Sequence, residues 1–435
     1  MKNIILKNIE NPNSHRIEEY IKAGGYFALE HAVNEMTPRD IIDDIKKSGL
    51  RGRGGAGFST GMKWQFASLD PKFPKYIVCN ADEGEPGTFK DRVILEKNPH
   101  QLIEGMVITA YALQSVRGYI YLRAEYPHVE KILNDAIQEA YAKGFLGNDI
   151  MSRHFRFNLS VHRGAGAYIC GEETALINSL EGRRGDPRVK PPFPVNSGAW
   201  SKPTIVNNVE TYANIPYIVE TSPKAYSFLG TRDAPGTKLF CVSGAVKNPG
   251  VFELQLGTPL REIIYDHCGG IRNGRALKGI IPGGLSTSIL TPDMIDCPMD
   301  FANLARHGSM LGSGAVIVLD DTMCIVKIYE RAMRFFEHES CGKCTPCREG
   351  TGWMRTILRR IEDGMADMED LATLEDVAHN VAGKTFCPLG EGAAQVLLSA
   401  MKRYRGEFEY HVKYKKCEVT DPSLRWGHMS MDELD

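Results

Sequence analysis

The strongest constraint on the fold is a group of four cysteines in the carboxyl-terminal part of the chain. Cys341, Cys344 and Cys347 are separated by two residues each, and Cys387 follows later. Each iron of a cubane cluster needs one protein thiolate, so three cysteines on one short loop suit three corners and a remote cysteine suits the fourth. Structural zinc, the alternative, more often takes two separate Cys-x-x-Cys pairs or adds histidines. The pattern therefore predicts a domain that encloses a [4Fe–4S] cluster.

The remaining cysteines are scattered, mostly through apolar stretches. Buried free thiols are the ordinary state of such residues. The chain has 11 cysteines and no export signal, and an odd total argues against a disulfide framework. We expect seven free thiols, at Cys79, Cys170, Cys241, Cys268, Cys297, Cys324 and Cys417.

Size and charge exclude several classes of protein. The chain has 435 residues, of which 43% are hydrophobic and 24% are charged, and its formal net charge is −2. This length can bury two or three domain cores. The charge balance gives no general attraction to nucleic acid or to an anionic membrane, and no apolar run is long enough to span a bilayer. We expect a soluble cytoplasmic protein, which other subunits must hold at the membrane if it serves a membrane process.

The order of predicted elements indicates three domains. Strands at 76–80, 118–122 and 156–161 alternate with helices, including one that ends near 114 and one at 128–142, which is typical of an α/β layer. A hairpin around residues 247–250, a helix at 259–268 and a strand near 278–281 give the β-β-α-β order of a ubiquitin-like β-grasp module. Residues beyond 323 are predicted to be helical. We predict a Rossmann-like α/β domain at 1–235, a ubiquitin-like domain at 236–322 and a helical cluster-binding bundle at 323–435.

Two glycine-rich segments are candidate ligand loops. The segment from Gly52 to Gly57 matches G-x-G-x-x-G, although a helix precedes it where a Rossmann turn would have a strand. Glycine lets backbone amides approach a phosphate or a flat ring closely, and the alternative is a simple helix–helix turn. The second segment, Gly164 to Thr174, leads from a strand into a helix whose first amides would suit a phosphate.

The cluster and the loops together predict redox chemistry fed by a nucleotide. Nicotinamides give up a hydride pair, whereas iron–sulfur clusters accept one electron at a time, and a flavin can do both. The residues therefore predict a flavin-dependent NAD(P)H dehydrogenase, and they leave the flavin, the nucleotide and the acceptor open.

Six segments together resemble one family, the flavoprotein (51-kilodalton, F) subunit of respiratory complex I. They are Arg51–Phe58, Cys79–Glu83, Gly164–Glu173, Lys190–Pro194, Val206–Thr211 and Glu339–Arg348. The resemblance implies FMN, NADH and one [4Fe–4S] cluster, with hydride transfer from NADH to FMN and single electrons passed on towards quinone in a proton-translocating complex. It also implies a two-iron ferredoxin-like partner subunit and other subunits of the peripheral arm. The alternative is the diaphorase subunit of a soluble NAD-linked hydrogenase or formate dehydrogenase, which shares the same core.

The same resemblance implies a set of site residues. Metal ligands would be Cys341, Cys344, Cys347 and Cys387. The flavin would be held by Gly52, Gly54, Gly55, Gly57, Lys63, Asn80, Asp82, Glu83, Asn207 and Asn208, with Gly171 and Glu172 close by. Further cofactor-binding residues would be Arg53, Ala56, Gly164, Gly166 and Thr211. The adenine of the nucleotide would stack among Phe58, Phe66 and Phe193, and its polar parts would contact Glu85, Glu173 and Lys190. No side chain need act as a nucleophile or general base, and Glu173 would favour NADH by repelling a 2′-phosphate.

Overall fold

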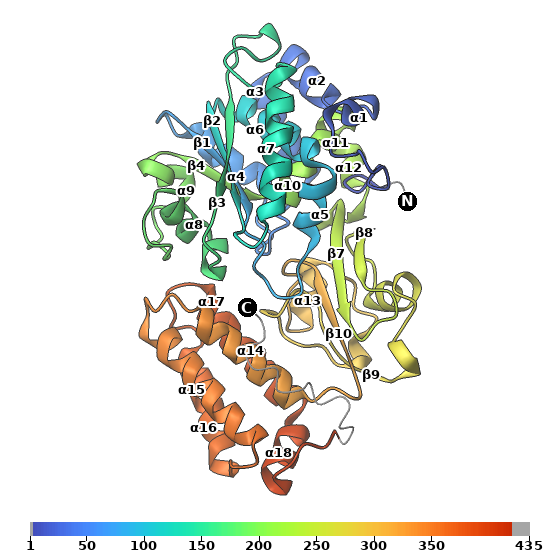
Figure 1. Ribbon diagram of the computed structural model, residues 1–435, viewed down its shortest axis with the longest axis vertical. Helices are drawn as coiled ribbons and strands as arrows, with labels where there is room; N and C mark the ends of the chain where they lie inside the picture. Colours follow the sequence, from blue (N-terminus) through green and yellow to red (C-terminus); the bar gives the residue numbers. More distant parts are fainter. Residues whose placement is uncertain (1–2, 420–435) are drawn as a thin grey trace.

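The computed structural model describes residues 3–419, which form two four-stranded sheets, a two-stranded ribbon and a helical bundle (Figure 1). The first sheet is parallel and has the strand order β3-β2-β1-β4. The chain builds outward from β1 through β2 to β3 and then returns to place β4 on the other side of β1. In open α/β sheets, ligands bind outside the carboxyl ends of the strands where the order reverses. Its strands are β1 Tyr76–Ala81, β2 Arg117–Leu122, β3 Asn158–Arg163 and β4 Thr204–Asn208.

Helices surround this sheet, and local sequence signals explain how several of them begin and end. Thr37 forms a capping box with Asp40 at the start of α3, and Gly49, with φ 70°, ends that helix in the left-handed region. Helix α6 is buried on nearly every side, and its few polar side chains, such as Glu104 and Gln101, are hydrogen-bonded within the protein. The helices are α1 Ile17–Lys22, α2 Phe27–Glu35, α3 Pro38–Ser48, α4 Thr60–Leu69, α5 Lys90–Lys97, α6 Pro99–Leu113, α7 Pro127–Ala142, α8 Glu173–Leu180, α9 Pro194–Ser197, α10 Val209–Ala213, α11 Ile215–Thr221 and α12 Pro223–Ser227.

One predicted helix is two helices in the structure. The sequence pattern before residue 114 predicts a single long helix, but α5 ends at Lys97 and α6 begins at Pro99. Asn98 between them has φ −139° and ψ 49°, outside the helical region. Proline disfavours a helical conformation in the residue before it, so the Asn98–Pro99 pair separates the two helices.

The second sheet has the order β8-β7-β10-β9 and forms the β-grasp module. Strands β7 Thr237–Gly244 and β8 Gly250–Gln255 form the predicted hairpin, and β9 Leu277–Ile281 agrees with the predicted strand. Strand β10 Ala315–Asp320, which pairs parallel with β7 and antiparallel with β9, is absent from the elements predicted above. The predicted helix at 259–268 is mainly the π-helical turn Glu262–His267, and α13 Phe301–Arg306 follows later. The ribbon pairs β5 Gly230–Thr231 with β6 Ala234–Pro235.

The carboxyl-terminal part is a helical bundle, as predicted. Its helices are α14 Ile325–Glu339, α15 Thr345–Glu362, α16 Met368–Val381, α17 Pro388–Arg403 and α18 Arg405–Tyr414. Their apolar faces form a core that also takes in residues of α8 from the first domain. The predicted boundaries at 235/236 and 322/323 stay a prediction.

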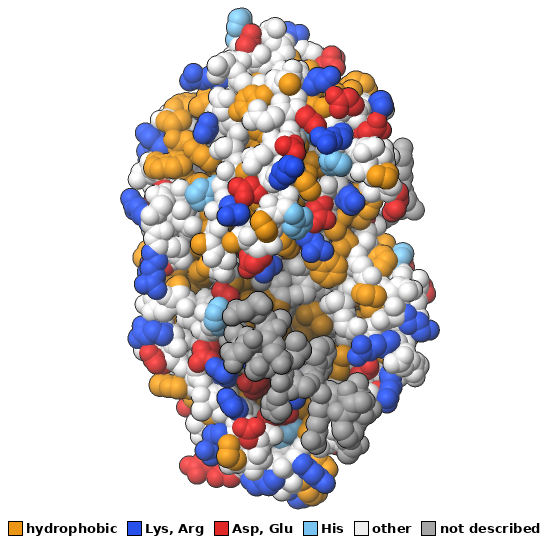
Figure 2. All heavy atoms as spheres, viewed as in Figure 1, with side chains coloured by type: hydrophobic (Ala, Val, Ile, Leu, Met, Phe, Trp, Pro, Cys, Tyr) orange, Lys and Arg blue, Asp and Glu red, His pale blue; other side chains and the backbone are white. Residues whose placement is uncertain are grey.

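The surface carries charges of both signs. On the face shown in Figure 2, basic and acidic side chains are intermixed. Among residues 3–419, no helix is long and apolar enough to cross a membrane.

Candidate functional site

The four predicted cluster cysteines come together in the structure. Cys341, Cys344, Cys347 and Cys387 line one small pocket, together with apolar groups that include Ile169. Cys344 is the residue before α15, Cys347 lies in the first turn of that helix, and Cys387 is the residue before α17. The amino-terminal ends of two helices therefore face the pocket.

This donor set fits a four-iron cluster. Helix amino termini carry partial positive charge, which stabilises thiolates and an anionic cluster. The backbone N–H of Phe386 donates to the Cys344 Sγ at 3.4 Å, and the Ser340 Oγ lies 3.3 Å from the Cys347 Sγ. Hydrogen bonds of this kind to cluster sulfurs are among the features that set a cluster's potential.

A cavity of about 580 Å³ opens at the carboxyl ends of β1 and β4, where the strand order of the first sheet reverses. Its volume is in the range of small-molecule and cofactor sites. Loops of the β-grasp module, including Ser286 and Ser309, and the start of α17 complete its wall. The predicted residues that line it are Gly54, Asn80, Asp82, Glu83, Glu85, Gly171, Glu172 and Asn208.

Two features of this cavity fit a flavin with its polyhydroxyl chain. The Oδ2 atom of Asp82 is buried without a hydrogen-bond partner, so it is available to a hydroxyl group. Burial raises the pKa of Asp82 to about 7, an effect that the nearby Arg123 partly offsets. Gly54 lines the cavity, and a Cβ there would lie 3.0 Å from the Cβ of Asn208, so glycine keeps this part of the wall uncrowded.

The acidic loop after β1 is held from two sides. Glu83 accepts hydrogen bonds from the backbone N–H groups of Asp91 (2.7 Å) and Arg92 (3.1 Å), which fixes the start of α5. Burial and then the Asp91 carboxylate raise the pKa of Glu83 to about 7. Glu85 accepts from the Tyr168 hydroxyl (2.5 Å) and from the backbone and hydroxyl of Ser286 (2.7 and 2.8 Å). Glu85 therefore joins the loop to the β-grasp module.

Four predicted residues form a chain of ion pairs beside the cavity. Lys63 lies 3.1 Å from Glu173, and Lys190 lies 3.1 Å from Glu173 and 2.7 Å from Glu172. Burial alone would raise the pKa of Glu173, but Lys63 and then Lys190 hold it below its ordinary value. Glu173 is therefore ionised at neutral pH, with a lysine on each of its two oxygens.

At the start of α8, the backbone amides that the sequence predicts to be open to a phosphate have partners within the protein, and the role of this segment in binding stays a prediction. Glu172 caps this helix, and its carboxylate accepts from the backbone N–H groups of Thr174 (2.8 Å) and Ala175 (3.0 Å). These amides are thus already bonded within the protein. Gly164 and Gly166 do not line the cavity either, and a Cβ on Gly164 would meet the Tyr121 hydroxyl at 2.9 Å.

The three aromatic residues predicted to stack on adenine are accessible, and none lines the cavity. The exposed fractions of Phe58, Phe66 and Phe193 are 56%, 45% and 53%, which is unusual for large apolar side chains. Helix α4, which carries Phe66, packs against α9, which Phe193 precedes. Their contact with a nucleotide stays a prediction.

The other predicted residues lie around the glycine loop without lining the cavity. The Arg53 side chain is buried and donates to the Tyr226 hydroxyl (2.9 Å) and the Pro235 carbonyl (2.7 Å), and its backbone N–H donates to the Thr211 Oγ1 (2.9 Å). A Cβ on Gly57 would lie 2.2 Å from the ring of Phe301, so Gly57 allows the loop to pack on the β-grasp module. The remaining predicted residues that do not line the cavity are Gly52, Gly55, Ala56 and Asn207.

Several charged and polar groups at the site are absent from the predicted set. Lys90 and Asp91 line the cavity, and Lys90 pairs with Asp91 (2.6 Å) and Glu210 (2.9 Å). Glu210 also pairs with Lys238 (2.5 Å), so this buried network joins the first domain to β7. Tyr168 belongs to the second glycine-rich segment, but nothing in that segment indicates that it lines the cavity.

Comparisons with known proteins agree with this architecture. Residues 45–217 match the family model described as the Nuo51 FMN-binding domain, residues 239–289 match the SLBB domain, and residues 327–411 match the NADH-ubiquinone oxidoreductase-F iron-sulfur binding region. The chain is 49% identical over 414 residues to the F 2 subunit of the NADH-quinone oxidoreductase of Rhizobium meliloti, covering 95% of this chain and 98% of that protein. It is 47% identical over 424 residues to the F subunit of the NADH-quinone oxidoreductase of Escherichia coli, covering 95% of both.

The chain belongs to the family of NADH-quinone oxidoreductase F subunits. This membership confirms the predicted fold class, FMN, NADH and one [4Fe–4S] cluster, and NADH oxidation with electron transfer to an iron–sulfur cluster. A chain of an NAD⁺-reducing [NiFe]-hydrogenase is also similar, with a TM-score of 0.82 and 36% identity over 92% of this chain and 67% of that chain. The roles of individual site residues stay predictions.

Proposed function

We propose that this chain is the NADH-oxidising subunit of a quinone-reducing, proton-translocating complex, and that electrons leave it through the four-cysteine site. When bound, FMN takes a hydride from NADH and releases electrons singly. The observation that carries the proposal is the position of Cys387. This residue lines both the 580 Å³ cavity and the four-cysteine pocket, so the two sites share a wall.

The residues of the cavity act by holding and orienting the flavin. Asp82 offers its unpartnered oxygen to a hydroxyl of the flavin side chain, and Gly54 gives the ligand access to the loop backbone. The side-chain amides that flank them are fixed, since Asn80 donates to the Gly171 carbonyl (2.9 Å) and Asn208 donates to Asp91 (2.6 Å). Alignment of two rings is sufficient for direct hydride transfer, so no general base is needed.

The nucleotide lies on the accessible side of the same site. Lys190 faces its diphosphate, and Glu173 accepts hydrogen bonds from the adenosine ribose. Phe66 and Phe193 stack on the adenine, which accounts for their large exposed fractions.

The partners are other subunits of the complex. We propose a two-iron ferredoxin-like subunit as the electron acceptor, further peripheral-arm subunits beyond it, and a position on the inner face of the cell membrane. Proton translocation and the quinone reaction belong to the whole complex. The names of the relatives support this arrangement.

A second candidate is the diaphorase role in an NAD⁺-reducing hydrogenase, which the structural similarity favours. The higher identity to the NADH-quinone oxidoreductase subunits, 47–49% against 36%, favours the first candidate. Purification of the native complex separates them. A quinone-reducing assembly with ferredoxin-like and membrane subunits supports the first, and co-purification of a nickel-containing subunit with hydrogen-dependent NAD⁺ reduction contradicts it.

The experiment that tests the electron route is Cys387→Ala in the purified complex. We expect NADH oxidation by ferricyanide to persist and electron transfer to quinone to be lost, together with the paramagnetic signal of the reduced cluster. Cys268→Ala, a buried thiol in the β-grasp module, is the control and should change none of these. If Cys387→Ala keeps the cluster signal and quinone reduction, Cys387 is not a ligand and the proposed route is wrong.

A further inference from the structure

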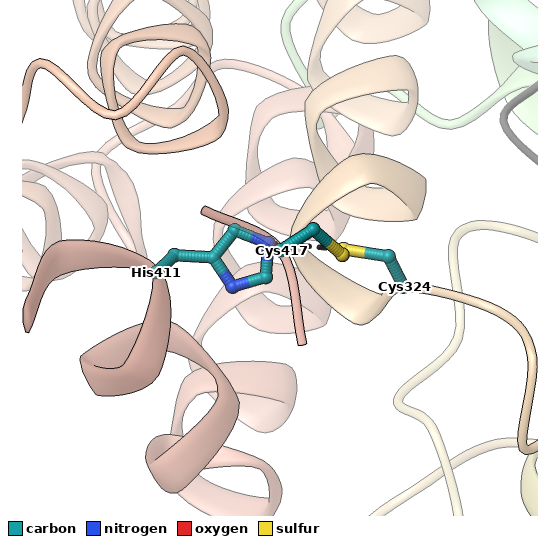
Figure 3. Close-up of side chains that lie close together, drawn as sticks. All are labelled: Cys324, His411 and Cys417. Atoms are coloured by element: carbon teal, nitrogen blue, oxygen red, sulfur yellow. Dashed lines mark hydrogen bonds between the residues drawn. The ribbon is translucent and has the colours of Figure 1, made fainter. Parts of the chain in front are cut away.

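A second group of metal-type ligands lies at the opposite end of α14 from the four-cysteine site. Cys324 is the residue before α14, His411 lies in α18, and Cys417 follows α18 (Figure 3). Their ligand atoms all lie within 4.8 Å of one another. Glu362, the last residue of α15, joins them, with its Oε2 atom 3.6 Å from the His411 Nε2 and 3.8 Å from the Cys324 Sγ. Helix α14 has 15 residues and so separates this group from Cys341 by about 22 Å.

The distances match the edges of a tetrahedral zinc site. Zinc binds thiolate sulfur at about 2.3 Å, imidazole nitrogen at about 2.0–2.1 Å and carboxylate oxygen at about 2.0–2.2 Å, so tetrahedral ligand–ligand edges are about 3.3–3.8 Å. Among Cys324, Glu362 and His411 the three edges are 3.4, 3.6 and 3.8 Å. Two thiols, one imidazole and one carboxylate form a mixed set that suits zinc better than calcium or magnesium, which prefer oxygen ligands.

The surroundings already orient these ligands. The Nδ1 atom of His411 lies 2.8 Å from the Glu407 carbonyl, to which it donates, so the Nε2 lone pair faces the two sulfurs. Metal-bound histidines characteristically make this outer hydrogen bond. The backbone N–H of Lys327 donates to the Cys324 Sγ (3.4 Å), and the Lys327 Nζ lies 4.0 Å from the other oxygen of Glu362. His411 is fully buried, and Cys324 is 9% exposed.

The His411 imidazole and the two cysteine sulfurs therefore lie within 4.8 Å of one another, and the Glu362 carboxylate lies beside His411 and Cys324. A thiol S–H is a weak donor and satisfies such acceptors poorly. We propose that Cys324, Cys417, His411 and Glu362 bind a structural zinc ion. The ion fastens the segment after α18 to the first turn of α14, and it is distinct from the iron–sulfur cluster. The sequence predicts free thiols at Cys324 and Cys417, and the alternatives to zinc are this state and a disulfide.

The test uses the purified complex, prepared without chelators from zinc-replete cells. Elemental mass spectrometry should find about one zinc per FMN, and this zinc should depend on the four ligands. The X-ray absorption of the zinc should show two sulfur ligands at about 2.3 Å. This measurement on the unaltered protein depends on no variant folding. Zinc below about a tenth of the FMN content, absorption without sulfur ligands, or a Cys324–Cys417 disulfide in the peptide map would each overturn the proposal.

Variants then assign the ion to this chain. Cys417→Ser should lose most of its zinc and keep FMN and the reduced-cluster signal, because the site lies at the far end of α14 from Cys341. Cys268→Ser is the matched control, a buried thiol in the β-grasp module, and should keep its zinc. Equal zinc in the two variants would place the ion elsewhere and refute the site.

Discussion

Asp82 gives the sharpest test of the flavin cavity, because one isosteric substitution should move two properties in opposite directions. Burial raises its pKa from 3.8 to about 7 in the folded protein. A carboxyl whose folded pKa is raised contributes stability that is present below its unfolded pKa and is lost as pH rises through the folded pKa. The pKa rise of about 3 units, at 1.36 kcal/mol each, corresponds to up to about 4 kcal/mol lost between pH 4 and pH 7.

Asp82→Asn removes this titration. In the apoprotein the variant should resemble the wild type near pH 4 and should exceed its free energy of unfolding by up to about 4 kcal/mol at pH 8. FMN binding above pH 7, where the Asp82 carboxyl is ionised, should change in the other direction, because a charged acceptor becomes a neutral amide. That exchange lowers the contribution of one hydrogen bond by about 1–1.5 kcal/mol, which weakens FMN binding about five- to tenfold.

The assays are urea-induced unfolding of the flavin-free protein at several pH values and fluorescence titration with FMN. Asp43→Asn, at a half-exposed position on α3, is the control and should alter neither quantity. Unchanged FMN affinity in Asp82→Asn would show that this carboxylate does not hold the flavin. A stability difference that does not depend on pH would refute the argument from burial.

Three further substitutions test other parts of the site. Gly54→Val should purify with iron and without FMN, because the added side chain crowds Asn208 in the wall of the cavity. Full flavin content would show that the loop is a simple turn. Glu173→Gln should raise the ratio of kcat/KM for NADPH to kcat/KM for NADH about tenfold. The shift is modest because lysines already flank this carboxylate. An unchanged ratio with lower thermal stability would show that Glu173 only stabilises the helix terminus. Glu210→Gln should lower the free energy of unfolding in urea by about 3–5 kcal/mol, since two buried lysines lose their shared partner. Adding Lys238→Met to this variant should restore part of the lost stability.

Local signals predict the elements that depend on neighbouring residues. The Thr37–Pro38 pair predicts the start of α3, and the alternation around residues 247–250 predicts the β7–β8 hairpin. Strand β10 pairs with β7 on one side and β9 on the other, and its apolar, β-branched run from Ala315 to Leu319 is a local strand signal that the predicted elements omit. The proline in the Asn98–Pro99 pair is a local signal for the break between α5 and α6, which the predicted single helix leaves out.

The candidate site also has parts that the sequence predicts and parts that it does not. The cluster cysteines are close in sequence apart from Cys387, so their spacing is sufficient to predict a common pocket. The Lys90–Glu210–Lys238 network joins residues from three separate segments, and no periodicity connects them. The glycines were predicted as a group, and only the folded structure separates Gly54, which faces the cavity, from Gly57, which packs against Phe301.

Residues from three parts of the fold form the wall of the cavity, so the cavity is complete only when these parts are packed together. Glu85, in the loop after β1, is bonded across the cavity wall to Ser286 of the β-grasp module, and Cys387 reaches the same wall from the helical bundle. Because Cys387 is also in the four-cysteine pocket, the packing that closes the cavity brings the two proposed cofactor sites side by side. The proposed zinc ion acts on the same arrangement from the other end of α14, because it fixes the helix whose carboxyl end leads into Cys341.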